Sequence, residues 1–471
     1  MSHVTFMSRI AAGACGALII GAAALAQTPS PAPAPAPAAP ASPLGIPLTA
    51  TITTPGYPAA GPADPALRVL QLPSGKKVHV LPATLETTQW GWFDNAQPPV
   101  LRVKSGDTIV LETMMHSHNQ VVPGVTIAQI KKLRTDFPGR GPHTLTGPIY
   151  IEEAQPGDVL KVRLNKIVPR AYATNFNVPG MFGQFPSVFQ DGQVKYMYLD
   201  LDNMTTEFLP GIVLPVRPFP GTLAVARKEP GRYSSVPPGE FAGNMDIRDF
   251  VAGTTLYVPV HVPGALLWTG DSHAGQGNGE INLTAIETGY KEFNITVEVV
   301  KGKPLDFPRI ETAKSWITMG FDQDLNKAWA QAKAQTAKFL SEQRGVSAAD
   351  AEKLMTSVSD CRVSQVVNIK KGIHCLNPKN VRGKEDMERP TKETPKYLVS
   401  HAKDADLSKA MNDASMGMIN LLASEKKLTR LDAYALASMA MDCRVGAISD
   451  TEKNVHCVMP KSIWVASAGK R

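Results

Sequence analysis

The residues with the clearest chemical potential in this sequence fall within eleven positions, Gly270–Glu280. The segment holds two acids, one imidazole and two amides, namely Asp271, Glu280, His273, Gln276 and Asn278. Carboxylates and imidazoles bind metal ions or act as general acids and bases. Its four glycines would let a ligand approach the backbone closely. The segment therefore predicts a metal or acid–base site, and a charged surface turn is the alternative.

Strand-like segments flank this cluster and should position it. An apolar, β-branched stretch runs from Thr254 to Trp268, and another follows from Ile281 to Ile286. The cluster thus predicts a glycine-rich loop between two strands. Similar short apolar runs, separated by Gly, Pro and Asp turns, recur from Leu67 to Ile310. They predict a mainly β fold with a sandwich-like or barrel-like core.

The pattern changes near Gly320 to an α+β type. Asp324–Gln343 is rich in Ala, Lys and Gln with apolar positions three and four apart, which predicts a helix. Ser347–Val358 predicts a second helix with Ser347 as its N-cap. A strand is expected to follow at the next cysteine, Cys361.

Short motifs from this region recur later in the chain at a constant offset of 82 residues. The run Asp360–Val363 (DCRV) returns as Asp442–Val445, and the pair His374-Cys375 returns as His456-Cys457. An unbroken register of this kind predicts a duplicated helix-helix-strand-strand unit. The second copy could serve assembly, and we expect a homo-oligomer.

The two copies hold all four cysteines that follow Cys15, and an even number in an exported chain suggests disulfides. Four cysteines allow three pairings. The simplest pairing lies within each copy, Cys361–Cys375 and Cys443–Cys457. The alternative is a zinc site that also uses His374 and His456, but adjacent residues of a strand point to opposite faces.

The amino-terminal residues predict export, to the periplasm or outside the cell. Arg9 precedes a small, apolar run, Ile10–Ala26, that ends in an A-x-A cleavage pattern. After signal removal the chain holds no apolar run of about 20 residues, so no membrane span is expected. The net charge of +7 has no Arg-rich or Lys-rich block behind it, which argues against nucleic-acid binding.

Several longer motifs, in order, resemble the acetamidase/formamidase family of linear-amide hydrolases. They are Ser105–Thr108 with Glu112-Thr113, His143–Asp158, Pro237–Asp246, the segment that follows Leu256–Val260, and Asp360–Lys379. The resemblance runs from about Leu81 to Lys379. It implies a mainly β fold and hydrolysis of a small linear amide to a carboxylate and ammonia. A non-catalytic binding protein that keeps this fold is the alternative.

The sequence departs from the family pattern in several places. Asn278 stands where family members commonly have Asp, so one carboxylate of the site segment is missing, and Ala242-Gly243 replaces a pair of glycines. Both cysteine pairs and the second repeat copy are additions to that pattern. Asn278 and the added copy are the grounds for the binding-protein alternative. The expected organisation is a signal peptide (1–26), a Pro/Ala-rich spacer (27–66), a β-rich core (67–318), the first copy (319–380), a linker (381–400) and the second copy (401–471).

Hydrolysis of an unactivated amide requires a strong nucleophile and a polarised carbonyl, which a bound divalent metal supplies. The candidate ligands are Asp271, His273, Asp246, His116 and His143. A mixed set of imidazoles and carboxylates suits zinc, whereas an all-oxygen set would suit calcium or magnesium. As alternatives, His116 could be an exposed loop residue and Asp246 could cap the segment that follows it.

Four more side chains are candidates for proton transfer and substrate binding. Glu280 or Glu152 could be the general base, because partial burial raises the pKa of a carboxylate. Asn244 and Gln276 could hold the amide or the developing oxyanion.

Overall fold

The computed structural model describes residues 69–380, 390–448 and 451–465. The expected signal peptide and spacer lie outside the described residues, as does the first part of the expected linker, 381–389. Among the helices of the described ranges, none combines the length and the apolar character that a membrane span requires.

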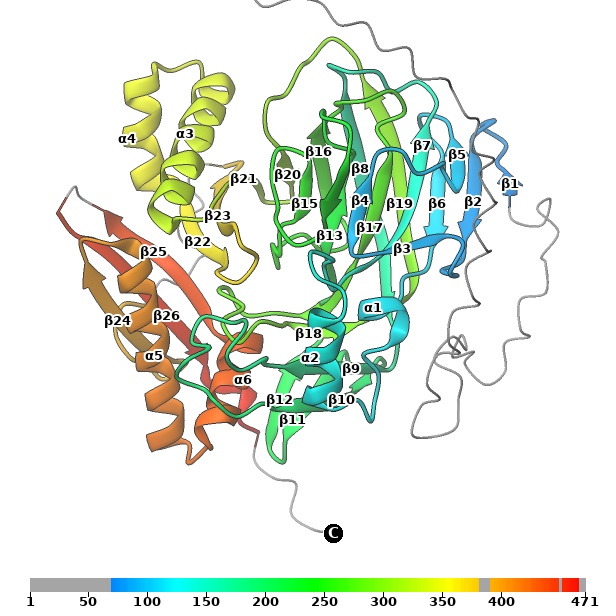
Figure 1. The fold of residues 1–471 in the computed structure, drawn as a ribbon. Helices are drawn as coiled ribbons and strands as arrows, with labels where there is room; N and C mark the ends of the chain where they lie inside the picture. Colours follow the sequence, from blue (N-terminus) through cyan, green and yellow to red (C-terminus); the bar gives the residue numbers. More distant parts are fainter. Residues whose placement is uncertain (1–68, 381–389, 449–450, 466–471) are drawn as a thin grey trace, which may run out of the picture. The chain divides into compact units, whose positions relative to one another are not determined.

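The described chain is built around two large sheets (Figure 1). In the described residues, the larger sheet has thirteen strands in the order β1 (Val69–Gln71), β2 (Lys77–Leu81), β6 (Thr108–Leu111), β19 (Tyr290–Val300), β8 (Val159–Pro169), β16 (Thr255–Pro259), β20 (Arg309–Glu311), β21 (Ser315–Asp322), β23 (Lys371–Pro378), β22 (Asp360–Gln365), β25 (Asp442–Ile448), β26 (Lys453–Pro460) and β24 (Tyr397–Asp404).

The second sheet carries most of the candidate site residues. Its main path is β12 (Ile212–Pro215), β11 (Thr205–Leu209), β10 (Val194–Asp200), β9 (Tyr172–Phe176), β18 (Ile286–Thr288), β17 (Leu267–Gly275), β13 (Phe219–Ala224) and β15 (Ala242–Asn244). β7 (Thr144–Ile151) pairs with β17 and also with β3 (Thr88–Trp90) and β5 (Leu101–Val103). A separate ribbon joins β4 (Trp92–Asp94) to β14 (Arg232–Ser234).

The two sheets share one hydrophobic core. Buried Ile109 and Val162 of the larger sheet belong to the same cluster as Leu145, Leu223 and Trp268 of the second. Side chains of β8 and β19 largely alternate between buried and more exposed positions, as expected of a sheet with one face on the core. The prediction of a mainly β fold with a sandwich-like core is thus confirmed.

The repeated unit follows this core and contains one more strand than predicted. The first copy consists of β21, α3 (Leu325–Arg344), α4 (Ala348–Val358), β22 and β23, and the second of β24, α5 (Leu407–Glu425), α6 (Arg430–Ala440), β25 and β26, followed by the short helix η3 (Lys461–Ile463). Corresponding elements begin 82 residues apart. The copies therefore start at 315 and 397, four residues before the predicted boundaries, because each unit begins with a strand that precedes its first helix.

The N-cap that the sequence predicts for the second helix is present in the structure. The side chain of Ser347 accepts a hydrogen bond from the backbone of Asp350 and caps α4, as predicted. Two short helices precede the repeats, α1 (His116–Asn119) and α2 (Ile127–Thr135).

The two copies join through β22 and β25, which pair antiparallel with Arg362 opposite Arg444. The larger sheet thus continues from the core through both copies. In Figure 1 the helices of each copy lie beside the strands of that copy.

Each copy contains its own disulfide, Cys361–Cys375 and Cys443–Cys457, as the simplest pairing predicted. The paired cysteines lie directly opposite each other on antiparallel strands. The zinc alternative is wrong, since its thiols are oxidised and Nδ1 of His374 lies 2.8 Å from the hydroxyl of Ser364.

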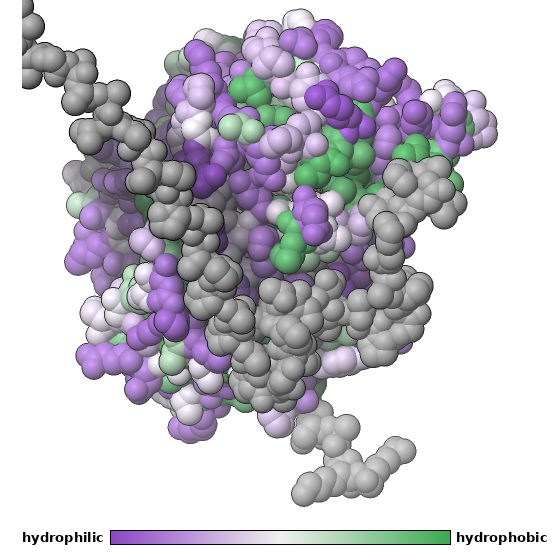
Figure 2. Space-filling view, turned by 45° about the vertical axis from the view of Figure 1, so that its right-hand side comes forward, coloured by the Kyte–Doolittle hydropathy of each residue, from purple (hydrophilic) through white to green (hydrophobic). Residues whose placement is uncertain are grey.

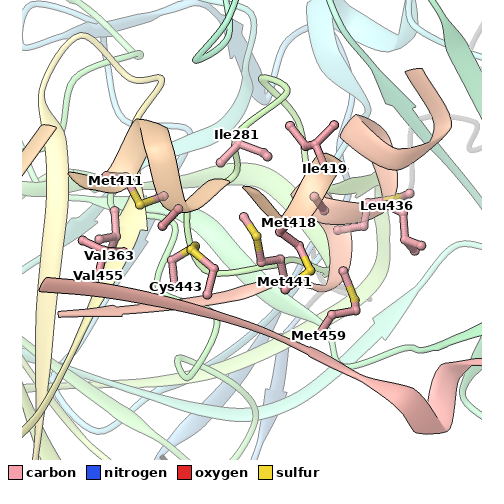
Figure 3. Close-up of a cluster of buried hydrophobic side chains, with 14 of the residues drawn as sticks. Ile281, Val363, Met411, Met418, Ile419, Leu436, Met441, Cys443, Val455 and Met459 are labelled. Atoms are coloured by element: carbon pink, nitrogen blue, oxygen red, sulfur yellow. A yellow bond between two sulfur atoms is a disulfide. The ribbon is translucent and has the colours of Figure 1, made fainter. Parts of the chain in front are cut away.

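A second hydrophobic core lies around the helices of the repeats. Methionines of the second copy recur along the part drawn in Figure 3, where Met411 lies near Val363 and Val455, and Met418 lies near Met441. Ile281, which belongs to the predicted site segment, packs in the same cluster. This contact links the second copy to the candidate site.

The site segment itself differs from the prediction. Gly270–Gly275 continues β17 instead of forming a loop, and Ile281–Ala285 is a connection instead of a strand. The connecting loop is 276–285, which we call the Glu280 loop. Apolar runs cannot distinguish a strand from a buried connection by pattern alone.

Candidate functional site

The centre of the site lies on β17. Asp271 and His273 are two positions apart on this strand, so both side chains leave the same face. They are 3% and 1% exposed, and Nε2 of His273 lies 3.3 Å from Oδ1 of Asp271. A buried charge needs partners, and further polar side chains gather here.

The two predicted histidines from distant segments reach the same carboxylate. His143 immediately precedes β7, which pairs with β17 opposite Gly270. His116 begins α1, after β6. Their Nε2 atoms lie 3.6 Å and 3.0 Å from Oδ1 of Asp271. Both are buried, so the alternative of an exposed His116 is wrong.

Glu287 completes this group, although the sequence analysis missed it. It lies on β18 directly opposite His273. Its Oε2 is 3.4 Å from Nε2 of both His273 and His116. The sequence offers only a weak signal, an acid that directly follows the apolar pair Ala285-Ile286 and would need a partner if buried.

A pair of acids lies on the other side of His273. Asp246 follows β15, and its Oδ1 is 3.9 Å from Nδ1 of His273. Glu280, in the Glu280 loop, is 3% exposed. Asn368 of the first repeat copy, also missed by sequence, donates its amide to Oδ2 of Asp246. The site thus combines the core with the first copy.

Backbone geometry at the acids is unusual. Asp246, Asp271 and Glu280 have φ of 49°, 51° and 49°, in the left-handed region that residues with a Cβ rarely adopt. Such strain persists only where the surroundings enforce it, and it concentrates at functional sites.

The electrostatics separate the three imidazoles. Burial disfavours the charged ring, but Glu287 and Asp271 outweigh it and raise the pKa of His116 to about 9 and that of His273 to about 10. For His143 burial dominates and lowers the pKa to about 4. The pKa of His143 shifts opposite to those of His116 and His273 because the last two lie closer to the acids.

The acids are separated in the same way. Burial opposes ionisation of Asp271, but His143 and His273 hold its pKa well below the usual range. Burial and the nearby Asp271 raise the pKa of Asp246 to about 8. Burial and Asp246 also raise the pKa of Glu280 well above its usual range.

The donor atoms fit a metal ion. Three overlapping groups have ligand atoms within 4.8 Å of one another: His116/His143/Asp271, Asp246/His273/Glu280 and Asp271/His273/Glu287. Several of their buried atoms lack a hydrogen-bond partner, among them Oδ1 of Asp246, Oε2 of Glu287 and both ring nitrogens of His273. Since unpaired buried polar atoms are costly, this pattern fits a cation held between them.

A cavity of about 130 Å³ opens onto this cluster. Site residues line one part of it, and apolar side chains line much of the rest, including Val121, Ile130, Phe176, Val178 and Leu283. Arg134, whose Nη1 is buried without a partner, and Arg140 also line it, and neither was predicted.

Figure 2 shows that one face of the molecule is mostly hydrophilic, with apolar residues in small patches.

The three remaining candidates have different positions. Asn244 lines the cavity, and its Oδ1 accepts from Thr222 at 2.9 Å. Gln276 is buried behind Asp246, where its amide donates to the Asp246 carbonyl at 3.3 Å, and it does not line this cavity. Glu152 lies in the exposed turn after β7, 4.0 Å from Lys104, so the structure does not bring it to the site.

Asn278 is also outside the cavity. Its side-chain amide donates to Oδ1 of Asp442 in the second copy, and its carbonyl accepts from the backbone of Cys443 at 3.2 Å. The expected loss of a site carboxylate at this position is therefore wrong: residue 278 faces the second copy.

A β-sandwich that gathers acids and imidazoles from several strand ends at one small cavity is the architecture expected from the sequence resemblance. Comparison with known proteins agrees. The sequence profile of the Acetamidase/Formamidase family matches residues 84–230 and 228–381, and the chain belongs to this family.

Individual relatives match over part of their length. Acetamidase of Mycolicibacterium smegmatis is 29% identical over 220 residues, which cover 34% of this chain and 54% of the relative. Formamidase of Methylophilus methylotrophus is 23% identical, with 42% of this chain and 61% of the relative covered. The chain thus spans little more than half the length of the curated relatives it matches.

Solved structures match more completely. The acetamidase structure from Bacillus halodurans aligns with a TM-score of 0.58 and 28% identity, over 64% of this chain and 97% of that chain. The acetamidase structure from Yersinia enterocolitica has a TM-score of 0.59 and 26% identity, over 66% and 95%.

Proposed function

We propose that the protein is an exported, metal-assisted hydrolase of small linear amides, which releases a carboxylate and ammonia. The observation that carries this proposal is the convergence of Asp271, His273, Glu287, His116 and His143 at one buried point beside a small cavity, which all of them except His273 line. Family membership and the names of the relatives favour amides as the substrate class.

The cluster would hold the divalent metal, with Asp271, His273 and Glu287 at its centre. Imidazole and carboxylate ligands together favour zinc. When bound, the metal supplies Lewis acidity for the carbonyl and lowers the pKa of water.

Glu280 is proposed to carry the proton from water to the leaving amine. It lines the cavity, and its Oε2 is buried without a hydrogen-bond partner. Asn244 helps shape the wall beside it, since its own amide donates to the carbonyl of Val236 at 3.0 Å. The unpartnered Nη1 of Arg134 is a donor for the acyl oxygen or the product carboxylate.

The cavity favours a small substrate with a short apolar group. Its volume of about 130 Å³ is well below the roughly 300–1,000 Å³ of pockets for drug-sized ligands. Val121, Phe176 and Leu283 would bury an alkyl group better than a second polar one. Formamide and acetamide are therefore the first substrates to test.

Two disulfides support export, because structural disulfides persist mainly in oxidising compartments. The binding-protein alternative was motivated by Asn278 and by the added second copy. Because Asn278 faces Asp442 instead of the cavity, Asn278 no longer supports that alternative.

The test measures ammonia release from short amides by the metal-loaded protein and after treatment with a chelator, together with its metal content. We expect turnover that the chelator abolishes and zinc restores. Glu280→Gln should lower kcat by about 10²-fold or more. Glu152→Gln is the matched control, because it removes an exposed carboxylate outside the cavity. Absence of turnover on every short amide, in protein with bound metal, would reject the proposal.

A further inference from the structure

Helix α6 of the second copy is more deeply buried than its counterpart α4 in the first. In α4 the buried side chains are Ala351, Met355 and Val358, which form one face. In α6 every residue of 433–439 is buried. A helix that is buried all round has neighbours on both faces, so α6 contacts something that α4 does not.

The copies differ in sequence on this additional face. Glu352 and Thr356 of α4 are exposed, whereas Tyr434 and Ser438 occupy the matching positions of α6 and are buried. Two surface positions of the first copy have thus become interior positions in the second.

Tyr434 contacts two loops that border the cavity. Its hydroxyl donates to the carbonyl of Ile281 at 2.7 Å and accepts from the backbone N–H of Phe185 at 3.2 Å. Its ring stacks on Phe189 with 4.1 Å between centroids. Ile281 directly follows Glu280 in the Glu280 loop, so this hydroxyl holds the backbone beside the proposed proton carrier.

Ser438 binds the same loop at three points. Its hydroxyl donates to the carbonyl of Thr284 at 2.8 Å and accepts from the N–H of Asn282 at 3.1 Å. Its carbonyl accepts from the N–H of Gly277 at 2.9 Å. A Cβ on Gly277 would lie 2.8 Å from that carbonyl oxygen, so only glycine allows this approach.

The Glu280 loop needs this support. Glu280 and Leu283 have φ of 49° and 114°, conformations that cost free energy unless neighbours enforce them. Glu280, Leu283 and Thr284 all line the cavity. A shift of the loop would therefore move both the proton carrier and one wall.

We propose that Tyr434 and Ser438 are positioning residues, through which the second repeat copy holds the Glu280 loop in its active conformation. The expected change in kcat rests on the proposed amide hydrolysis. The expected change in the conformation of the Glu280 loop rests on the hydrogen bonds alone. The added copy is thus a part of the site's scaffold.

The test compares three single variants of the full chain. Tyr434→Phe keeps the ring and its stacking but removes the hydroxyl, and Ser438→Ala removes the second hydroxyl. Thr356→Ala is the control, because the Thr356 hydroxyl bonds only within its own helix, to the carbonyl of Lys353 at 2.7 Å. The measurements are kcat and KM for acetamide, and amide hydrogen exchange of residues 277–285.

We expect Tyr434→Phe and Ser438→Ala each to lower kcat by about tenfold with little change in KM, since a buried carbonyl or amide loses its partner. Exchange in 277–285 should accelerate in both variants and not in Thr356→Ala. Parent-like exchange in the two test variants overturns the proposal, as does faster exchange with parent-like kcat. If the parent protein hydrolyses no amide, the proposed function fails, and the exchange result alone decides the positioning role.

Discussion

Substitution of Gly221 by alanine is the sharpest perturbation that the site offers. Gly221 lies on β13, beside β17, and an added Cβ would be 2.5 Å from Oδ1 of Asp246, 2.5 Å from Oδ2 of Asp271 and 2.7 Å from Cε1 of His273. The backbone at Gly221 is not in the left-handed region, so the methyl group itself is the perturbation.

The magnitude follows from these distances. Because Cβ contacts shorter than 3.0 Å essentially do not occur, both carboxylate oxygens must move by at least 0.5 Å. Catalytic groups need positions accurate to about 0.5 Å, and a misplacement of about 1 Å can cost 10²-fold in rate. We therefore expect Gly221→Ala to lower kcat/KM for acetamide by about 10²-fold and to weaken metal binding, at a cost of about 1–3 kcal/mol in stability from overpacking.

The assay combines ammonia release, metal content per chain and denaturant unfolding. Gly417→Ala is the control, since its added Cβ would meet Ser400 at 3.3 Å, within the second copy and outside the cavity lining. The control should retain parent activity and metal content. A Gly221→Ala protein with full metal content and parent kcat/KM would refute the assignment of this cluster as the reactive centre.

Three further predictions concern the repeats. Asp249 of the core lies 3.2 Å from Arg362 and 3.5 Å from His374 of the first copy. Burial opposes ionisation of Asp249 and Asp442, but the hydrogen bond with His374 and the charge of Arg362 hold the pKa of Asp249 below the ordinary 3.8, as Arg248, Arg362 and Arg444 do for Asp442. The stabilisation from both acids is complete above that pH and is lost as the pH falls below it, so urea unfolding between pH 7 and 3 should show the loss, and Asp249→Asn should reduce it. Asn278→Asp should place a second carboxylate against Asp442 and lower the free energy of unfolding by about 2 kcal/mol, without any gain in turnover. Replacing Cys443 and Cys457 by alanine should cost about 3 kcal/mol, measured by denaturant unfolding, because the disulfide closes a short loop; stability equal to the parent would contradict the entropic argument.

Much of the site could be predicted because its side chains sit in polar sequence next to apolar strands. Asp271, His273, Asp246, His116 and His143 do converge, which the sequence could suggest through motif order but could not demonstrate. The duplication was predictable from its constant offset, and so were the disulfides.

The wrong or absent predictions for Glu287, Asn368 and Glu152 have physical causes. Glu287 follows only two apolar residues, and the pairing of β18 with β17 brings it to the candidate metal-binding cluster. Asn368 comes from a distant turn of the first copy. Glu152 resembles a site acid in sequence, yet the turn after β7 faces solvent. Tertiary packing decides all three positions, and local sequence patterns do not encode it.

The departure from the family pattern at Asn278 and the presence of a second copy have one explanation. Asp442 belongs to the repeated Asp-x-Arg motif, in which Arg444 donates to Asp442 as Arg362 donates to Asp360. When the second copy packs against the Glu280 loop, Asp442 comes into contact with residue 278. A carboxylate there would add like charge in a buried position, whereas an amide donates a hydrogen bond to the acid. The neutral residue at 278 thus suits the contact with the second copy, and it leaves the candidate metal-binding cluster unchanged.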